Sequence, residues 1–375
     1  MDYNEHFEQL VKEQLARVEK MKADPGPTDF LNKDVLTIGL IDGDGIGPII
    51  ADETKKVLEV LLSDEIKAGK VKLKDIKGLT IENRVKCMKP VPDDVLAEIK
   101  SCDLLLKGPT TTPDKKMGYP NIESANVALR KELDLFANIR PVKVPEEGID
   151  WIFFRENTEG EYALGSKGVD ISDDMSIDFK VTTTQGTKRI ARAAFEYAKA
   201  NGNLPVSIIT KANILKKTDG KFLALCYEMA KEYPGIAVDD YYVDIMSANL
   251  IKKGVREKYR VFVLPNLYGD IITDEAAQIQ GGVGTAGSAN TGNRYAMFEA
   301  IHGSGLRMMQ EGRGGYANPS SLMKAAEMML RHIGMVEKAD RLEDAVDKAI
   351  AKTNMTGRDG GNTASEFTDA VLEVL

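Results

Sequence analysis

The chain has 375 residues, of which 43% are hydrophobic, and a formal net charge of −8 at pH 7. This length allows a large buried core and predicts two domains or one interrupted domain. The negative charge argues against a nucleic acid or an anionic membrane as partner. The three cysteines are widely spaced without a Cys-x-x-Cys pair, which indicates neither a disulfide framework nor a thiolate metal site, so we expect a reducing, cytoplasmic location.

The first thirty residues predict a docking helix followed by a linker at 24–27. Apolar residues recur there at helical spacing, namely Phe7, Leu10, Val11, Leu15, Val18 and Met21. Acidic residues interleave with the basic ones, which is unlike a transit peptide, and no apolar run resembles a secretory core. No stretch of the chain approaches the roughly 20 apolar residues that span a bilayer.

Strand and helix patterns then alternate, which predicts an α/β architecture. Buried strands are expected at 36–41, 103–106, 151–154, 206–209, 241–243 and 260–264. Helices are expected at 49–67, from 93 onward, at 188–200 and at 222–231. The sequence contains no internal repeat.

Two glycine-rich stretches bear on nucleotide binding. The stretch 282–287 matches G-x-G-x-x-G, but it follows a helix and is not in a strand-to-helix turn, so we do not predict a Rossmann turn there. The loop 41–48 does follow a strand, but its glycines do not have the G-x-G-x-x-G spacing. These glycines permit the backbone to turn tightly, and a nucleotide could pass beside them.

Asp270 and Asp274 follow the predicted strand 260–264. A helix beginning after Gly269 would place both carboxylates on one face. Hard ions such as Mg²⁺ or Mn²⁺ take carboxylate oxygens, and three histidines are too few to suggest a zinc cage. The alternative is a solvated helix N-terminus that favours acidic residues.

Three arginines, Arg130, Arg140 and Arg155, end three successive elements just before the acidic stretch 156–159. Arginine captures carboxylates through two parallel hydrogen bonds. With the aspartate pair, the arginines indicate a pocket for a small, multiply carboxylated acid. The alternative is that each arginine only pairs with a surface acid.

The most specific signal is a set of blocks in a fixed order. They occupy 43–48, 124–141, 155–162, 211–213, 266–274 and 302–304. Together they resemble the β-decarboxylating dehydrogenases of the isocitrate and 3-isopropylmalate dehydrogenase family. The resemblance implies that family's α/β two-domain fold, which is not a Rossmann fold. It implies an N-terminal extension at 1–34, a large cofactor-side domain at 35–134 and 281–375, and a small domain at 135–280 with a dimer arm near 160–185.

The resemblance also implies roles for particular residues. Arg130, Arg140 and Arg155 resemble the substrate-carboxylate arginines, Asp270 and Asp274 resemble ligands of Mg²⁺ or Mn²⁺, and Asp244 resembles a third ligand from the neighbouring subunit. Tyr162 and Lys211 resemble the catalytic pair, which faces across the interface of a homodimer. In that chemistry a 2-hydroxy acid loses hydride and its hydroxyl proton, then CO₂, and the enol is protonated.

The substrate assignment depends on Ser124, Asn126 and Arg130, which meet the C3 substituent and resemble the isocitrate enzymes' Ser-x-Asn-x-x-Leu-Arg. Opposite an isopropyl group, a buried Ser or Asn would be left unpaired at about 1–3 kcal/mol each. The alternative for Ser124 is a plain helix N-cap. The preceding loop 114–123 is longer than in the bacterial isocitrate enzymes.

The cofactor is expected to be NAD, with NADP open. Predicted cofactor contacts are Thr112, His302, Gly303, Ser304, Arg307, Asn318 and Asp359. Arg307 and Arg313 suit a 2′-phosphate, whereas Glu311 suits a ribose hydroxyl. The stretch 356–362 resembles the NAD-linked relatives.

The resulting prediction is a metal-dependent NAD-linked isocitrate dehydrogenase of the tricarboxylic acid cycle, acting on a tricarboxylate. Homoisocitrate, 3-isopropylmalate and NADP-linked isocitrate dehydrogenases remain alternatives, as does oxidation of tartrate or malate. A non-catalytic regulatory subunit is a further alternative, although the chain retains every residue carried over above.

Overall fold

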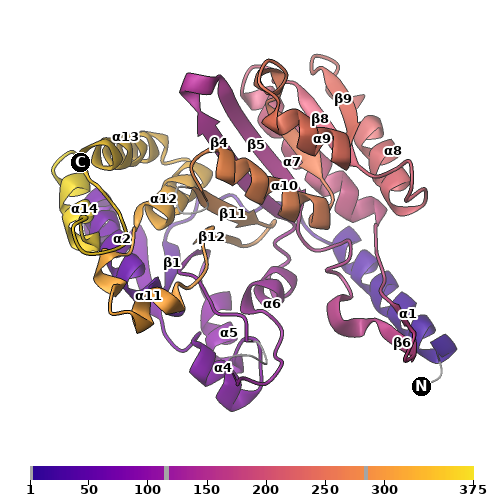
Figure 1. The fold of residues 1–375 in the computed structure, drawn as a ribbon, viewed down its shortest axis with the longest axis horizontal. Helices are drawn as coiled ribbons and strands as arrows, with labels where there is room; N and C mark the ends of the chain where they lie inside the picture. Colours follow the sequence, from indigo (N-terminus) through magenta and orange to yellow (C-terminus); the bar gives the residue numbers. More distant parts are fainter. Residues whose placement is uncertain (1–2, 114–117, 283–285) are drawn as a thin grey trace. The chain divides into compact units, whose positions relative to one another are not determined.

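The computed structural model describes residues 3–113, 118–282 and 286–375 (Figure 1). Helices and strands alternate along the chain, and the predicted α/β class is confirmed. Contacts divide the chain into two compact units. Unit 1 consists of Met1–Gly26 and Phe136–Gln280, and unit 2 of Pro27–Leu135 and Gly281–Leu375.

Unit 2 contains a sheet in which the strands lie in the order β2 (Val71–Ile76), β1 (Leu36–Ile41), β3 (Leu104–Lys107), β12 (Ala296–Ala300) and β11 (Gly287–Thr291). All neighbours in this order are parallel except β11 and β12. The buried apolar residues of β1 and β3 are typical of parallel strands that are covered on both faces.

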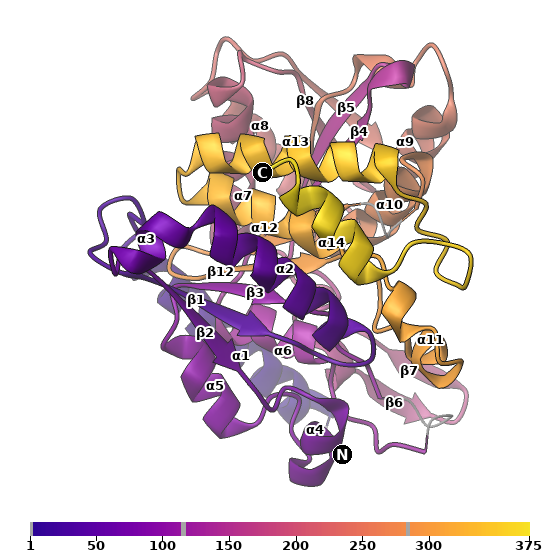
Figure 2. The ribbon, with the colours of Figure 1, turned by 90° about the vertical axis from the view of Figure 1, so that its left-hand side faces the viewer.

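The helices of unit 2 lie around this sheet (Figure 2). They are α2 (Gly47–Leu61), α3 (Ser63–Lys67), α4 (Ile81–Cys87), α5 (Asp93–Lys100), α6 (Ala125–Glu132), α11 (Leu306–Gln310), α12 (Ser320–His332), α13 (Val336–Lys352) and α14 (Ala364–Leu372). Helices α2 and α12 contact one another and the sheet. Helices α5 and α6 contribute Val95, Ile99 and Leu129 to a core cluster with β1, β3 and β12.

Unit 1 contains strands in the order β4 (Ala137–Val144), β5 (Ile149–Glu156), β10 (Val261–Leu264), β8 (Val206–Thr210) and β9 (Val238–Tyr242). Only β4 and β5 are antiparallel. Its helices are α1 (Tyr3–Lys22), α7 (Thr184–Ala200), α8 (Thr218–Ala230), α9 (Val243–Ile251) and α10 (Asn266–Ile279). A separate antiparallel hairpin joins β6 (Val169–Ser172) and β7 (Met175–Ile177). Short 3-10 turns occupy Pro145–Glu147, Gly165–Lys167, Arg256–Lys258 and Gly314–Tyr316 of the two units.

Two cores sandwich the unit 1 sheet. Helices α7 and α8 pack on one core cluster with Phe154 and Ile208, and helices α9 and α10 pack on another with Phe153 and Phe262. Neighbouring residues of β5 therefore point to opposite faces, as a strand requires. This arrangement places the ends of β4 and β5 beside α10.

Four helices differ from the predictions, and α7 and α8 each begin four residues earlier than expected, at Thr184 and Thr218. The helix expected at 49–67 is interrupted at Leu62, a buried residue with φ −102° and ψ 14° that separates α2 from α3. Helix α10 begins at Asn266, earlier than predicted, because Pro265 provides the extended residue before it. Gly269 is inside this helix, where a Cβ atom would approach the Arg155 side chain to 2.5 Å. That glycine therefore makes room for an arginine and does not start the helix.

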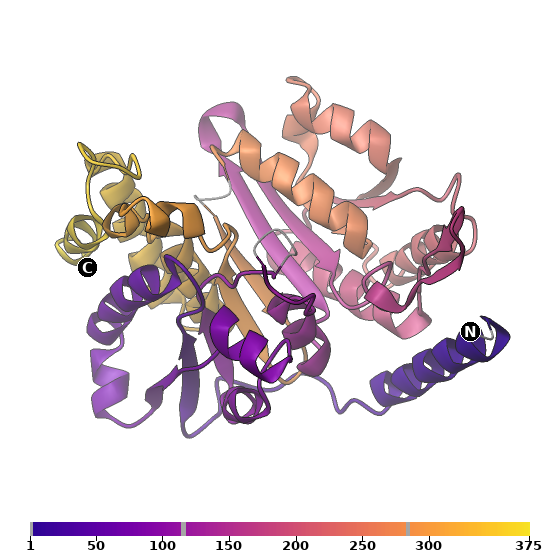
Figure 3. The ribbon, with the colours of Figure 1, turned by 60° about the horizontal axis from the view of Figure 1, so that its bottom comes forward.

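Helix α1 corresponds to the helix predicted at the N-terminus and has 20 residues (Figure 3). Leu10 is its buried residue. Within the described ranges, no helix combines the length and the apolar character needed to cross a membrane.

Candidate functional site

In unit 1, the two predicted metal ligands each contact an arginine of the neighbouring strands. Arg155 of β5 pairs with Asp270, and Nη1 of Arg140 in β4 lies 2.8 Å from Oδ1 of Asp274. Asp270 and Asp274 lie one turn apart on α10, with side chains 39% and 62% exposed. Both arginines are buried. The structure thus brings two predicted substrate arginines to the predicted metal face.

Tyr162 joins the same group. Its hydroxyl donates to Oδ2 of Asp270 at 2.7 Å, and the Arg155 guanidinium lies 5.4 Å from the centre of its ring. Asn266 holds the Arg155 guanidinium in place: its Oδ1 accepts from Nε of Arg155 at 3.0 Å and from Nη2 of Arg155 at 2.7 Å. A buried arginine held this firmly is pre-organised for binding an anion.

The chemistry of this face fits a hard divalent cation. Asp270 and Asp274 supply exposed carboxylate oxygens, the donors that Mg²⁺ and Mn²⁺ prefer. Across residues 3–113, 118–282 and 286–375, no group of three or more His, Cys, Asp or Glu side chains is placed to hold a metal ion. Within one chain, this face therefore offers two carboxylates.

Lys211 and Asp244 form a second pair in unit 1. Lys211 follows β8, Asp244 lies in the first turn of α9, and the Lys211 ammonium donates to Oδ1 of Asp244. This hydrogen bond lowers the pKa of Asp244 below its ordinary value. The Lys211 backbone N–H donates at 2.7 Å to Asp219, which is fully buried and pairs with Lys180 at 2.6 Å. Asp219 thereby fixes the backbone of Lys211.

The third predicted substrate arginine lies in unit 2. Nη2 of Arg130 is 3.4 Å from Oε1 of Glu299, and Nζ of Lys107 is 3.4 Å from Oε2. Burial acts to raise the pKa of Glu299, but the charges of Lys107 and Arg130 outweigh it and the pKa falls below its usual value. Burial lowers the pKa of Lys107. The ionised Glu299 carboxylate therefore forms an ion pair with Arg130 that is largely shielded from water.

The other residues predicted to contact the C3 substituent lie on α6. Oδ1 of Asn126 accepts from the Thr110 hydroxyl at 3.1 Å. Ser124 precedes the helix but makes no side-chain capping hydrogen bond, so it is not the plain N-cap of the alternative interpretation. Buried Arg84 donates to the carbonyls of Thr111 at 2.7 Å and Glu123 at 3.1 Å. Arg84 therefore ties both ends of the long loop, whose residues 114–117 lie outside the described ranges.

Several predicted cofactor contacts gather in unit 2. The Ser304 carbonyl accepts from Ile46 N–H at 2.9 Å, and its hydroxyl lies 2.8 Å from that of Thr111. Gly45 has φ +60°, and a Cβ atom there would approach the Ser304 carbonyl to 2.0 Å. The glycine-rich loop 41–48 thus packs on the backbone of 303–304. The other candidate glycine stretch, 282–287, includes residues outside the described ranges.

One ring nitrogen of His302 is available for a hydrogen bond to a ligand in this region. Its Nδ1 lies 3.0 Å from the Gly303 carbonyl, whereas Nε2 is buried and has no hydrogen-bond partner in the described part of the chain. Burial lowers the pKa of His302. A buried ring nitrogen without a partner suits a base-edge contact of a nucleotide.

The remaining predicted cofactor residues are exposed or locally bonded. Glu311 accepts from Nε of Arg307 at 2.7 Å and from Nε of Arg313 at 2.8 Å. Oδ1 of Asn318 accepts from the Ser320 N–H at 3.0 Å, Asp359 accepts from the Tyr316 hydroxyl at 3.3 Å, and Thr112 is exposed.

The polar residues of these groups that were not predicted include Arg84, Lys107, Asp219 and Glu299. Lys107 could have been found, because a lysine that ends an apolar strand and precedes Gly-Pro is unusual on a buried strand. Glu299 is the penultimate residue of the buried strand β12, three residues before His302, but nothing in the sequence indicates its partners.

Two buried glutamates follow Arg155. Glu156 accepts from the Thr158 and Glu159 N–H groups, at 3.0 and 2.6 Å. Burial, together with the charge of Glu159, raises the pKa of Glu156 from 4.5 to about 7. These carboxylates lie between Arg155 and Tyr162 in the sequence and are not exposed to substrate.

Comparisons with known proteins identify the family to which this chain belongs. Residues 37–371 match the family model described as isocitrate/isopropylmalate dehydrogenase. The chain is 36% identical over 353 residues, 90% of each chain, to a mitochondrial regulatory subunit of the isocitrate dehydrogenase [NAD] of Dictyostelium discoideum. It is 37% identical to the 3-isopropylmalate dehydrogenase of Archaeoglobus fulgidus, over 90% of this chain and 99% of that one.

A solved structure is similar as well. The crystal structure of isocitrate dehydrogenase from Methylococcus capsulatus matches with a TM-score of 0.79 and 35% identity, over 90% of this chain and 99% of the other. These relatives differ in the substrate that their names state, so they identify the family and leave the substrate open. The chain belongs to the isocitrate/isopropylmalate dehydrogenase family of β-decarboxylating dehydrogenases.

Proposed function

We propose that the protein catalyses the oxidative decarboxylation of isocitrate to 2-oxoglutarate and CO₂, with reduction of NAD and with Mg²⁺ or Mn²⁺ as the metal. The observation that carries the proposal is the polar face of α6. Asn126 is already oriented by Thr110, and Arg130 by Glu299. An apolar C3 substituent would offer no acceptor to the Asn126 amide N–H groups or to the remaining Arg130 N–H groups, whereas a carboxylate would accept from them.

Substrate binding uses all three arginines. Arg140 and Arg155 bind carboxylates beside the aspartate face, and Arg130 binds the carboxylate at C3. Each guanidinium is pre-paired in the structure, with Asp274, Asp270 and Glu299 respectively. An incoming anion competes with or extends these pairs without the arginines losing further rotational freedom.

Asp270 and Asp274, with Asp244 of the partner subunit, would hold the metal ion. When bound, that ion supplies Lewis acidity at the hydroxyl and C1 carboxylate oxygens, and NAD accepts the hydride from C2.

Two residues of this chain move protons. Lys211, whose backbone is held by Asp219, accepts in its neutral amine form the proton that leaves the C2 hydroxyl as the carbonyl forms, and it releases that proton to solvent before the next turnover. After the bond from C3 to the leaving carboxylate breaks and CO₂ departs, Tyr162 delivers a proton to C3 of the enol. The proton on the Tyr162 oxygen is held towards Asp270 at 2.7 Å.

The proposed assembly is a homodimer with shared sites. Exposed apolar residues on α9 and α10, namely Ile245, Ile251 and Ile271, give unit 1 a face that a second copy would cover. The Lys211–Asp244 pair then completes the partner's site.

The experiment is an initial-rate assay with DL-isocitrate and Mn²⁺, comparing NAD with NADP, with EDTA as control. 3-Isopropylmalate, homoisocitrate, malate and tartrate serve as alternative substrates. We expect NAD reduction that EDTA abolishes, with isocitrate preferred. A higher kcat/KM on another acid would overturn the substrate assignment.

The Dictyostelium relative is named a regulatory subunit, so a second candidate is a non-catalytic subunit. This candidate predicts no turnover by the purified chain with any acid or cofactor. It also predicts that a catalytic relative becomes more active when the chain is added.

A further inference from the structure

Helix α1 precedes the family match at 37–371, and it lies against the arm of unit 1, the segment 160–183. Three polar contacts join it to the arm: the Tyr3 hydroxyl with the Ile171 carbonyl at 3.0 Å, the His6 ring with the Lys167 carbonyl at 3.0 Å, and the Glu13–Lys167 ion pair at 2.5 Å. All three are exposed, and exposed polar contacts of this kind add little stability.

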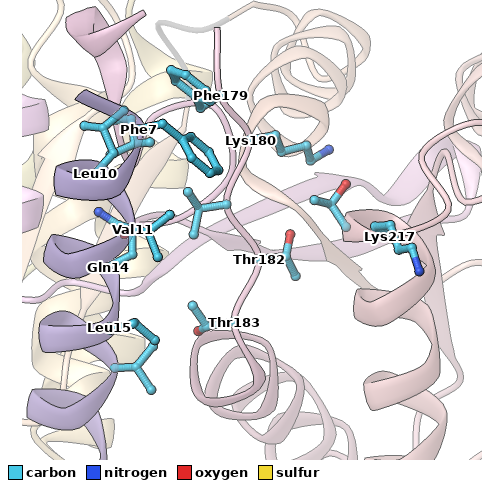
Figure 4. Close-up of a pocket in the computed structure, with 14 residues that line it drawn as sticks. Phe7, Leu10, Val11, Gln14, Leu15, Phe179, Lys180, Thr182, Thr183 and Lys217 are labelled. Carbon is cyan, nitrogen blue, oxygen red and sulfur yellow. The ribbon is translucent and has the colours of Figure 1, made fainter. Parts of the chain in front are cut away.

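The apolar face of α1 packs only in part: Leu10 is buried, and the Phe7 ring lies 5.9 Å from the Phe179 ring. It lines an open groove of about 390 Å³, whose other wall includes Phe179 and the segment 181–183 (Figure 4). Phe7 remains 53% exposed and Leu15 60% exposed. The helix is therefore held by limited apolar packing together with polar contacts, and one of the polar contacts differs from the rest.

Arg17 reaches a buried carboxylate. Its Nη2 lies 2.9 Å from Oε1 of Glu159, and the Glu159 side chain is 4% exposed. The Thr183 N–H donates to the other carboxylate oxygen at 2.8 Å. Because Glu156 lies beside Glu159 and is buried too, the positive charge of Arg17 reduces a repulsion between two desolvated acids.

A continuous set of contacts leads from Glu159 to the predicted site, all within unit 1. The Glu159 carbonyl accepts from Nδ2 of Asn266 at 3.0 Å, and Oδ1 of Asn266 accepts from Nε of Arg155 at 3.0 Å. Arg155 contacts Asp270, which accepts the Tyr162 hydroxyl at 2.7 Å. Displacement of Glu159 therefore disturbs both the start of the loop that carries Tyr162 and the asparagine that orients Arg155.

We infer that Arg17 is a positioning residue for the reaction: it fixes the Glu159 carboxylate, and with it the segment 157–162 and the Tyr162 hydroxyl. Helix α1 is thus a clamp on the active-site loop, and its release lowers turnover. This inference rests on the proposed function for its effect on rate, whereas its effect on the loop stands independently.

The test compares Arg17→Met, Arg17→Lys and the control Lys12→Met in the full chain. Lys12 lies on the same helix and pairs with Glu8, with both side chains about two-thirds exposed. For Arg17→Met we expect kcat to fall by about tenfold and the KM for isocitrate to rise by less than about threefold, since Arg155 is disturbed only through Asn266 while Arg130 and Arg140 stay in place. Arg17→Lys should have a higher kcat than Arg17→Met but a lower one than wild type, because lysine keeps the positive charge but lacks the planar guanidinium. Lys12→Met behaves as wild type.

A second readout is hydrogen–deuterium exchange of the amides of 157–162. Gly160 N–H donates to the Val181 carbonyl at 2.8 Å, so it reports directly on the loop. Arg17→Met should exchange faster there, and Lys12→Met should not. Unchanged exchange in Arg17→Met, or faster exchange with an unchanged kcat, would overturn the positioning role.

The two proposals fail in different ways. If the wild type turns over none of the acids, the proposed function fails, and the exchange comparison still decides whether Arg17 fixes the loop. If the wild type is active and Arg17→Met matches it in both readouts, the clamp fails alone.

Discussion

Tyr162 and Asp270 share a hydrogen bond of 2.7 Å, while Arg155 pairs with the other oxygen of the same carboxylate. One aspartate thus links a predicted proton donor, a predicted substrate arginine and a predicted metal position. Oδ1 of Asp270 contacts Arg155, whereas Oδ2 accepts from Tyr162. Substitutions at Tyr162 and at Arg155 should therefore affect catalysis and substrate binding separately.

Tyr162→Phe should lower kcat by about 10²-fold, because the proton for C3 must then come from water. The KM for isocitrate should change by less than about threefold, since Arg155 and Asp270 remain. Steady-state kinetics test this. Tyr227→Phe is the control, because Tyr227 is 37% exposed and its hydroxyl also donates to an aspartate, Asp240. Equal losses in the two variants would contradict the role of Tyr162.

Arg130→Lys should reduce kcat/KM for isocitrate by about 10²-fold or more, because an ammonium cannot bind both a carboxylate and Glu299 with a planar fork. The neighbouring Lys131→Met provides the control, since Lys131 pairs with Glu123 on the surface. Kinetics that Arg130→Lys leaves unchanged would remove Arg130 from the substrate pocket.

Asp244→Asn and Tyr162→Phe should each lower the activity strongly, yet heterodimers of the two variants should regain part of it. One of the two shared sites would then contain both wild-type residues. The measurement is the rate after co-expression and isolation of heterodimers with two affinity tags. No recovery in verified heterodimers would show that Asp244 and Tyr162 act in the same chain.

Glu311→Ala should shift cofactor preference towards NADP. Glu311 accepts from both Arg307 and Arg313, and its removal frees two guanidiniums for a 2′-phosphate. We expect the ratio of kcat/KM for NADP to that for NAD to rise by about tenfold or more. Glu327→Ala, which removes a partner of Arg331 on α12, is the control. An unchanged ratio would place these residues outside the cofactor site.

Glu156→Gln should change the pH dependence of stability. Because the pKa of Glu156 is raised to about 7, its contribution to stability is fully present below pH 4.5 and is lost as pH rises through 7. Stability of the variant relative to wild type should therefore increase between pH 5 and pH 8, by on the order of 2 kcal/mol. Thermal unfolding across this range measures it. A difference that stays constant with pH would show that Glu156 is ionised in the folded protein throughout.

The sequence predicted the strands that are short apolar runs, as in 36–41 and 206–209, but it did not predict β2, β4, β11 or β12. It also placed Asp270 and Asp274 on one helix face, since that depends only on spacing. The predicted start of α10 was wrong, because a glycine such as Gly269 commonly marks a helix boundary. In the structure Gly269 lies inside the helix, where its missing side chain leaves space for Arg155. Such a role depends on a contact between distant residues, which spacing does not encode.

The same limit applies to the buried ion pairs. Lys107 and Glu299 are 192 positions apart, and Arg17 and Glu159 are 142 apart. Their pairing follows from the packing of separate elements. A charged residue in an apolar strand indicates that some partner exists, but local sequence patterns do not identify that partner.

The first turn of α7 bears on which substitutions the gene tolerates. A methyl group on Gly186 would approach the Glu159 carboxylate to 2.3 Å, whereas one on Gly220, within α8, would meet no atom within 4 Å. In a saturation library selected for growth on enzyme activity, alanine should be depleted at codon 186 and retained at codon 220, where it favours the helix by about 1 kcal/mol. An engineer seeking added thermostability can replace one helical glycine and must keep the other.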